Sequence, residues 1–318
     1  MMKAIVVHQY GGPEVLALED APVPVPGLDA ALVRVAAAGV GPWDALIRTG
    51  TSGMPVTLPV IPGSDIAGVV ESVGANVTSV KPGDAVFGVT NESFTGGYAQ
   101  YALASAASIA AKPQSLDFMA AASVPVVAAT AWQMLFERAK VAKGQTVLVH
   151  GAAGNVGSYA VQLAIWAGAR VVAVAGARDA EYVKSVGATD VIDFHAQTFE
   201  NLVSNVDAVI DTVGGETQER SFSVLRPGGA LISSVSSPSQ ELAARFAVRV
   251  DFFIVRVPSD QLERIAQLLD DGTLKADVGT VLRLDQARTA HEMLAGKVAH
   301  ARGKIVLGVT SADTGSLS

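Results

Sequence analysis

The sequence predicts an α/β protein in which a β-rich part accompanies a doubly wound parallel sheet. Up to about residue 120, short apolar or alternating runs lie between Gly and Pro clusters, which is typical of strands joined by turns. Beyond that point, strand-like and helix-like segments alternate with short Gly-marked joints, which is typical of a parallel sheet with crossover helices. The length of 318 residues suits two domains.

The β-rich part is predicted from runs such as "KAIVVHQ", "SDIAGVVESVG" and "DAVFGV". In the second part, "TVLVHG" predicts a buried strand, and "NVGSYAVQLAIWAG" has the periodicity of a helix. The runs "ARVVAVAG", "VDAVIDTVG" and "GGALISSV" are further predicted strands. Two more helices end at Gly272 and Gly296, and "GKIVLGV" is a final strand.

The composition limits the possible partners and the cellular location. The net charge of −7 argues against nucleic acid or an anionic membrane as the main partner. The chain has no cysteine, which excludes disulfides and thiolate-ligated metal sites. The N-terminal segment lacks the features of a signal peptide, and the most apolar stretch is broken by Pro125. We therefore expect a cytoplasmic protein with no membrane or nucleic-acid partner.

A glycine-rich turn follows the strand "TVLV" and suggests a dinucleotide site. Its pattern is Ala152-x-Gly154-x-x-Gly157, with Gly151 before it, so Ala stands where such loops usually have their first Gly. The helix after the turn directs free N–H groups and its dipole at an anion. The alternative is a purely structural strand-to-helix turn. The predicted phosphate-binding residues are Gly151, Ala152, Ala153, Gly154, Asn155, Val156 and Gly157.

The end of the second strand favours NADPH over NADH. An NAD site would place Asp or Glu there to accept from the ribose hydroxyl, but the strand ends in "AVAG", with Gly176 near the expected spacing. Arg178 follows and could pair with a 2′-phosphate. Two observations leave alternatives open: Asp179 lies beside Arg178, and Arg178 could be a solvated residue at a helix start.

Taken together, the motifs resemble those of the medium-chain dehydrogenase/reductase superfamily, specifically its zinc-free, quinone-oxidoreductase-like (zeta-crystallin-like) branch. The resemblance runs from about residue 3 to 309 and includes "HQYGGPEVL", "PGSDIAGVVESVG", "HGAAGNVG" and "DAVIDTVGG" in the family's order. It implies a GroES-like domain formed by residues 1–123 and 259–318. A Rossmann domain, 124–258, is inserted between them, and the cofactor lies in the cleft.

The resemblance also implies a homodimer and a site without metal. "RVDFFIV" matches the edge strand through which members of this branch commonly pair. The Gly-His-Glu motif of zinc members matches "PGSD" here, so Ser64 and Asp65 replace two of its residues, and the histidines show no metal-ligand spacing. Without a Lewis acid, reduction of an activated acceptor is favoured over simple alcohol oxidation.

The expected reaction is hydride transfer from NADPH to the β-carbon of an enone or quinone. Three residues are candidates for catalysis, each with a structural alternative. Asp44 could contact substrate or ribose, or fix its own turn; Trp43 could be a pocket wall or a core aromatic. Thr130 begins a predicted helix and could bond near the nicotinamide or act as a cap.

The turn "VGPWDALIRTG" departs from the family's substrate-side pattern. Gly41 stands where relatives often have Asn, and Leu46 where they have Tyr, which predicts a more apolar pocket and makes quinone itself less certain. Asn91 is expected to border the cleft. The remaining residues that the resemblance assigns to the cofactor are Phe194, Val235, Ser236, Phe253 and Ile254.

The leading hypothesis is therefore an NADPH-dependent, zinc-independent reductase of quinones or α,β-unsaturated carbonyls. Its partner would be a small electrophilic carbonyl compound or quinone. One alternative is a dinucleotide-binding sensor or structural protein with little turnover. An NAD-dependent alcohol dehydrogenase is a third possibility, with the right fold but no metal ligands.

Overall fold

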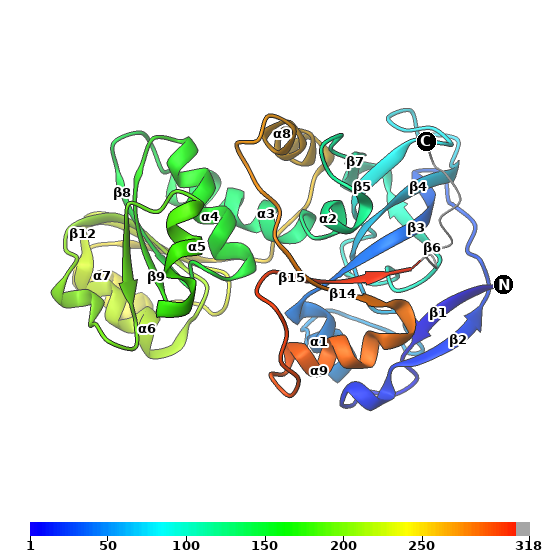
Figure 1. Ribbon diagram of the computed structural model, residues 1–318, viewed down its shortest axis with the longest axis horizontal. Coiled ribbons are helices and arrows are strands. Elements are labelled where there is room, and N and C mark those ends of the chain that lie inside the picture. The colour runs from blue at the N-terminus through cyan, green and yellow to red at the C-terminus, as the bar shows by residue number, and fades with distance from the viewer. Residues whose placement is uncertain (310–318) are drawn as a thin grey trace. The chain divides into compact units, whose positions relative to one another are not determined.

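The computed structural model describes residues 1–309, which form two compact units (Figure 1). The first unit comprises Met1–Val126, Val257–Gly272 and the described residues from Ala276 onward. The second comprises Val127–Arg256 and Thr273–Lys275. The predicted α/β class, in which a β-rich part accompanies a parallel sheet, is confirmed.

The second unit is built on a parallel sheet with the strand order β10-β9-β8-β11-β12-β13. Its strands are β8 (Thr146–His150), β9 (Arg170–Ala175), β10 (Asp190–Asp193), β11 (Val206–Asp211), β12 (Leu225–Ser233) and β13 (Arg249–Phe252). Leu148 on β8 pairs with Val172 and is buried with Val209 and Leu231 in the core. Central parallel strands are covered on both faces, which explains why their sequences are almost continuously apolar.

Helices connect these strands, and the helix before β8 begins earlier than the sequence predicts. The helices of this part of the chain are α3 (Pro125–Trp132), which continues as the π-helix η3 (Gln133–Ala139), α4 (Asn155–Trp166), α5 (Ala180–Ser185), α6 (Gly215–Arg220) and α7 (Gln240–Phe246). Thr130 was expected to begin a helix, but α3 begins at Pro125, where proline's missing N–H costs nothing. Thr130 therefore lies inside α3, is 7% exposed and is not the N-terminal cap.

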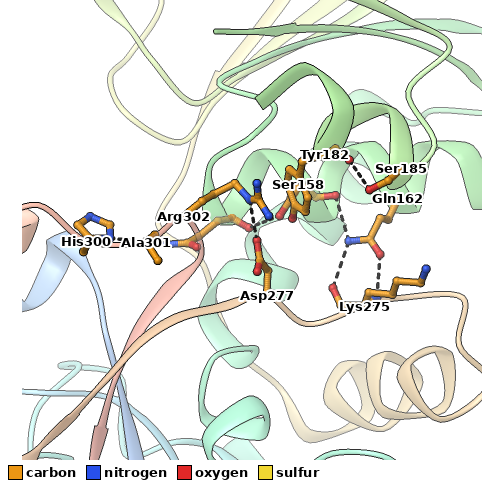
Figure 2. A network of polar contacts seen from close by, with 10 residues as sticks. Ser158, Gln162, Tyr182, Ser185, Lys275, Asp277, His300, Ala301 and Arg302 are labelled. Carbon is orange, nitrogen blue, oxygen red and sulfur yellow. Dashed lines mark hydrogen bonds and ion pairs between the residues drawn. The ribbon is translucent and has the colours of Figure 1, made fainter. Parts of the chain in front are cut away.

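The short segment Thr273–Lys275 belongs to the second unit, where the side-chain amide of Gln162 is hydrogen-bonded to the backbone of Lys275 (Figure 2). Gln162 on α4 donates from Nε2 to the Lys275 carbonyl at 3.3 Å and accepts from the Lys275 N–H at 2.7 Å. The same Nε2 also donates to the Ser158 carbonyl one turn back along the helix. These bonds satisfy a buried amide and hold an otherwise irregular segment against α4.

The first unit contains a seven-stranded sheet and a two-stranded sheet. The larger sheet has the order β14-β15-β3-β4-β5-β7, with β6 also paired to β3; β14 is parallel to β15, and the other pairs are antiparallel. Its strands are β3 (Ala30–Val40), β4 (Asp65–Val73), β5 (Ala85–Val89), β6 (Tyr101–Ser105), β7 (Ile109–Ala111), β14 (Val278–Arg283) and β15 (Lys304–Gly308). The smaller sheet pairs β1 (Met2–Val6) with β2 (Ala17–Ala21).

Within residues 1–309, the α-helices that accompany these sheets are α1 (Pro42–Thr49), α2 (Phe118–Ala122), α8 (Ser259–Asp270) and α9 (Ala287–Leu294). The core joins residues distant in sequence, such as Val33, Ile66, Ala290 and Leu307. The C-terminal strands thus complete a sheet that the N-terminal residues begin. Among residues 1–309, no helix combines the length and apolar character needed to cross a bilayer.

Candidate functional site

The predicted cofactor residues of the second unit collect at one edge of its sheet. They follow the carboxyl ends of β8, β9, β10, β12 and β13, and all these strands are parallel, so their ends meet at the same edge. From β8 the chain continues on one side of the sheet to β9 and β10, and it then crosses to β11 on the other side of β8. Parallel sheets of this kind bind ligands where the strand order reverses. The glycine-rich turn follows β8, directly at that point.

The geometry of the glycine-rich turn explains its unusual sequence. Gly151 has φ +66°, so it makes the sharp turn in the left-handed region. Ala152 is fully buried and donates its N–H to the Val174 carbonyl at 3.1 Å. A Cβ on Gly157 would lie 2.8 Å from the Gly151 carbonyl carbon and 2.9 Å from Ala152 Cα, so only glycine fits there. The first glycine of the usual pattern is displaced by one position.

The turn leads into the amino end of α4, where backbone donors are free to bind an anion. Gly154 caps the helix in an extended conformation, and Ser158 donates to the Gly154 carbonyl at 2.9 Å, which is the first bond of the helix. The N–H groups of Asn155, Val156 and Gly157 precede that bond and point out of the helix end. Small residues and outward N–H groups fit the pyrophosphate of a dinucleotide.

The turn after β9 combines a glycine, an aromatic ring and a cation. Gly176 directly follows the strand, and a Cβ on it would lie 3.6 Å from Cε1 of Phe194. Phe194 comes after β10 and is 56% exposed. Arg178 is exposed in the 3₁₀ turn Ala177–Asp179. An aromatic ring beside a small residue could pack on an adenosine, and a guanidinium nearby could pair with a phosphate.

A buried carboxylate, which sequence reasoning did not single out, links the loops after β11 and β12. Asp211 is fully buried; its Oδ1 accepts from the N–H groups of Val213 and Gly214, both at 2.9 Å. Its Oδ2 accepts from Nε2 of Gln218 at 2.8 Å, and that nitrogen also donates to the Ser236 carbonyl at 3.1 Å. The loop that carries Val235 and Ser236 is therefore tied to the loop after β11.

His150 packs at the end of β8. Burial lowers the pKa of His150 to about 4, so the ring is neutral near pH 7. Its Nε2 lies 2.9 Å from Ser221 Oγ, and that hydroxyl donates to the Thr217 carbonyl at 2.7 Å. Since the hydroxyl hydrogen is used, Nε2 is the donor and the proton is on Nε2. Phe199 covers the ring edge-on, with centroids 4.7 Å apart.

In the first unit, Asp44 lies in the first turn of helix α1 and is fully buried. Its Oδ2 accepts from the Gly41 N–H at 2.8 Å and from the Tyr98 hydroxyl at 2.9 Å. Burial raises the pKa of Asp44 to about 7, although the Gly41 N–H, Lys304 and the Tyr98 hydroxyl all oppose the shift. The side chain has no exposed surface, and its bond to the Gly41 N–H fixes the turn into α1.

Trp43 lies half-buried beside a buried ion pair. Its Nε1 donates to Ser64 Oγ at 3.0 Å, and the Lys304 ammonium lies 4.2 Å from the centroid of its ring. Lys304 Nζ and Asp65 Oδ2 are 3.0 Å apart, with side chains 1% and 0% exposed. Burial raises the pKa of Asp65, and the Lys304 ammonium opposes that shift.

Ser64 and Asp65, the residues at the positions of the zinc motif, are thus engaged with protein groups. Asp65 Oδ1 also accepts from the Val126 N–H at 3.0 Å. Within residues 1–309, no three His, Cys, Asp or Glu side chains gather closely enough to hold a metal ion. Sequence reasoning anticipated the exchanged residues but not their new partner, because Lys304 is distant in sequence and "GKIVLG" shows no charge pattern of its own.

The other predicted residues lie as follows. The side chain of Asn91 makes hydrogen bonds within its own loop. Its Oδ1 accepts from the Ser93 N–H at 2.9 Å, and its Nδ2 donates to the Thr95 carbonyl at 2.7 Å. Asn91 also lines a surface groove of about 370 Å³ in the first unit. After β13, the Arg138 guanidinium covers the ring of Phe253 at 4.8 Å, and Ile254 is 64% exposed.

Known proteins match nearly all of the chain. Three family models match in succession: "Alcohol dehydrogenase GroES-like domain" over residues 27–114, "Glutamate/Leucine/Phenylalanine/Valine dehydrogenase" over 115–215 and "Zinc-binding dehydrogenase" over 186–307. The quinone oxidoreductase of Pongo abelii is 34% identical over 96% of this chain and 98% of its own. The chloroplastic NADPH-dependent alkenal/one oxidoreductase of Arabidopsis thaliana is 32% identical over 96% and 79%.

Among solved structures, the quinone oxidoreductase of Coxiella burnetii matches with a TM-score of 0.90 and 33% identity, over 97% of this chain and 99% of its own. The similarity therefore extends over both units rather than over the unit with the parallel sheet alone.

Proposed function

Because the chain belongs to the quinone-oxidoreductase-like branch of the medium-chain dehydrogenase/reductase family, we propose that it reduces quinones or α,β-unsaturated carbonyls with NADPH, without zinc. It is an oxidoreductase. A bound nicotinamide would supply the hydride, which adds to the β-carbon of the acceptor while the electron pair moves to the carbonyl oxygen. A proton from water or a weak acid completes the product.

The observation that carries this proposal is the carboxyl edge of the parallel sheet. The residues from Gly151 to Gly157 would hold the pyrophosphate with backbone N–H groups. Gly176, Arg178 and Phe194 would surround the adenosine 2′-phosphate. Val235, Ser236, Phe253 and Ile254 would lie on the nicotinamide side, where the Asp211–Gln218 bonds restrain the loop of Val235 and Ser236.

On the acceptor side, we assign Trp43 a contact role and Asp44 a positioning role in place of a catalytic one. Asp44 is fully buried and bonded to the backbone and Tyr98, so it orients α1. Thr130 stays a candidate for a contact near the nicotinamide. Gly41 would border the acceptor, and the loop of Asn91 is a further candidate for the substrate side.

Steady-state NADPH oxidation with a panel of enones and quinones tests the reaction. We expect turnover with at least one electrophilic acceptor, at equal rates with and without EDTA. A rate that depends on added zinc would contradict the proposal. Tight NADPH binding without turnover across the panel would instead select a sensing or structural role.

Cofactor preference is tested by titrating NADPH and NADH. Arg178→Ala should weaken NADPH binding about tenfold and leave NADH unchanged, because only NADPH carries the phosphate that the guanidinium would pair with. Equal losses for both cofactors would mean that Arg178 does not read the phosphate. Lys140→Ala is a control for the removal of one exposed positive charge from the same unit.

We also propose a cytoplasmic homodimer paired through β13. This strand is the last in the sheet order; its final residue, Phe252, is 38% exposed, and Ile254 just after it is 64% exposed. Ile254→Asp should yield a monomer by light scattering. An unchanged mass would place the dimer contact elsewhere.

A further inference from the structure

The π-helix η3 is hydrogen-bonded to the chain that follows β13. Gln133, the first residue of η3, is 4% exposed. Its Nε2 donates to the Arg256 carbonyl at 2.6 Å, and its Oε1 accepts from the Arg256 N–H at 3.3 Å. Residues 253–256 lie in neither a helix nor a strand. The side-chain amide of Gln133 therefore supplies, at Arg256, both of the bonds that a helix or sheet would otherwise supply.

Arg138, further along η3, contacts the same part of the chain. Its Nη1 lies 3.3 Å from Asp251 Oδ2 on β13, and its guanidinium lies 4.8 Å from the centroid of the Phe253 ring. Arg249, also on β13, donates to the carbonyls of Arg138 and Ala139 at 3.2 and 3.1 Å. Carbonyl groups in the last turn of a helix have no partner within the helix. These bonds therefore fasten the end of η3 to β13.

The wide turns of η3 explain how two of its side chains reach one segment. Residues four apart are neighbours on the surface of an α-helix, whereas bonding from residue i to residue i+5 makes residues five apart neighbours. Gln133 and Arg138 are five apart, and in an α-helix they would lie on different sides. The π-helix, a form that occurs frequently at functional sites, thus directs both side chains toward residues 251–256.

The stretch between β13 and Arg256 is short and is attached at both ends. Phe252, the last residue of β13, is paired with β12 in the sheet, and Arg256 is paired with Gln133. Between them lie Phe253 and Ile254, which the proposed function assigns to the nicotinamide side. Hydride transfer requires the reacting atoms at near-contact distance in a defined orientation, so a small shift of this stretch would have a large effect on the rate.

We propose that Gln133 and Arg138 are positioning residues for hydride transfer: they fix residues 253–256 and, through them, the orientation of the bound nicotinamide ring. The inference rests on the proposed function, because it takes Phe253 and Ile254 to lie on the nicotinamide side. Neither positioning residue touches the reacting atoms or transfers a proton. Their loss reduces the rate and the facial selectivity of hydride transfer, while the pyrophosphate contacts keep the cofactor bound.

Hydrogen exchange in the cofactor-free protein tests the attachment. Gln133→Met keeps a long side chain but loses the amide, so exchange at residues 253–256 should become about tenfold faster. Gln162→Met is the matched control, because the Gln162 amide makes an equivalent pair with the backbone of Lys275 in the same unit. That variant should accelerate exchange at Lys275 and leave residues 253–256 unchanged. Unchanged exchange at residues 253–256 in Gln133→Met would overturn the attachment.

Kinetics with NADPH deuterated at one face of C4 tests the consequence for hydride transfer. The unmodified protein should transfer from one face only. In Gln133→Met, kcat should fall roughly tenfold to a hundredfold, and transfer from the other face should become measurable. The Kd for NADPH should change less than about threefold. Arg138→Met should act in the same direction, and since Arg138 is exposed it keeps the test available if Gln133→Met does not fold.

The control variant separates positioning from a general loss of stability. Gln162→Met should keep the kcat and the facial selectivity of the unmodified protein. Equal losses of kcat in Gln133→Met and Gln162→Met, or full facial selectivity in both Gln133→Met and Arg138→Met, would overturn the positioning role and leave the reductase proposal intact. No turnover of any acceptor by the unmodified protein would overturn the reductase proposal and the role in hydride transfer with it.

Discussion

The proposed cofactor edge, at the carboxyl ends of the parallel strands of the second unit, and the α1 region of the first unit are built in different ways. The cofactor edge consists mainly of backbone: a left-handed glycine, a close approach at Gly157 and the open end of α4. The α1 region consists of side chains packed on one another, with Trp43, Ser64, Asp65 and Lys304 in contact. A backbone site tolerates many sequences around it, whereas a packed site depends on each partner.

The largest effect is expected where the packed region buries charge. Lys304→Met would leave the Asp65 carboxylate buried without its cation and should lower the free energy of unfolding by about 3–5 kcal/mol in urea titrations. Lys304→Met with Asp65→Asn should recover part of the loss because no charge then remains. If the single and double variants are equally unstable, the pair does not stabilise this region electrostatically.

The buried carboxyl of Asp44 should give the packed region a pH dependence. Its folded pKa, about 7, lies above the ordinary value of 3.8, so the folded protein holds a proton that the unfolded chain has lost. Its contribution should be fully present below pH 4 and lost as the pH rises toward 7, by up to about 1.4 kcal/mol per pH unit.

This slope is isolated by comparison with Asp44→Asn, which cannot titrate. His150 and His291, with pKa values lowered to about 4 and about 3, contribute with the opposite sign, and the comparison cancels them. The stability of Asp44→Asn relative to the unmodified protein should rise between pH 4 and 7. Parallel curves would show that the carboxyl is ionised throughout.

At the cofactor edge, Gly157→Ala should affect binding more than folding. The new Cβ would press on the backbone of Gly151 and Ala152 and displace the turn, so affinity for NADPH and NADH should fall together, roughly tenfold to a hundredfold. Fluorescence titration of both cofactors measures this. A loss restricted to one cofactor would contradict a shared pyrophosphate cradle.

The smallest effect is expected from the link between the loops after β11 and β12. Gln218→Leu removes the bonds to Asp211 and Ser236 and should cost about 1–2 kcal/mol of stability. It should also raise KM for NADPH more than it lowers kcat, whereas Gln218→Glu should be worse because its carboxylate faces that of Asp211. An unchanged KM for NADPH in Gln218→Leu would mean that the link serves only the fold.

The same contrast explains how much the sequence predicts. Periodicity and Gly spacing are local signals, so the parallel sheet and the turn at Gly151–Gly157 are readable from neighbouring residues. The partners of Trp43 are not, because Lys304 and Asp65 meet only when β15 and β4 flank β3 in one sheet. Thr130 was misassigned for a related reason: α3 begins at Pro125 within an apolar run that shows no clear boundary.

The position of β15 has a consequence for the order in which the protein is completed during synthesis. The stretch Val127–Arg256, which makes up nearly all of the second unit, is contiguous and emerges from the ribosome as one piece. The first unit begins earlier in the chain but is incomplete until β15 has been synthesised. This strand pairs with part of β3 and brings Lys304 to the carboxylate of Asp65. Domains tend to fold as units during translation. The unit that starts first is therefore finished last, and a chain interrupted before Lys304 has a complete second unit and a first unit whose larger sheet has an open edge.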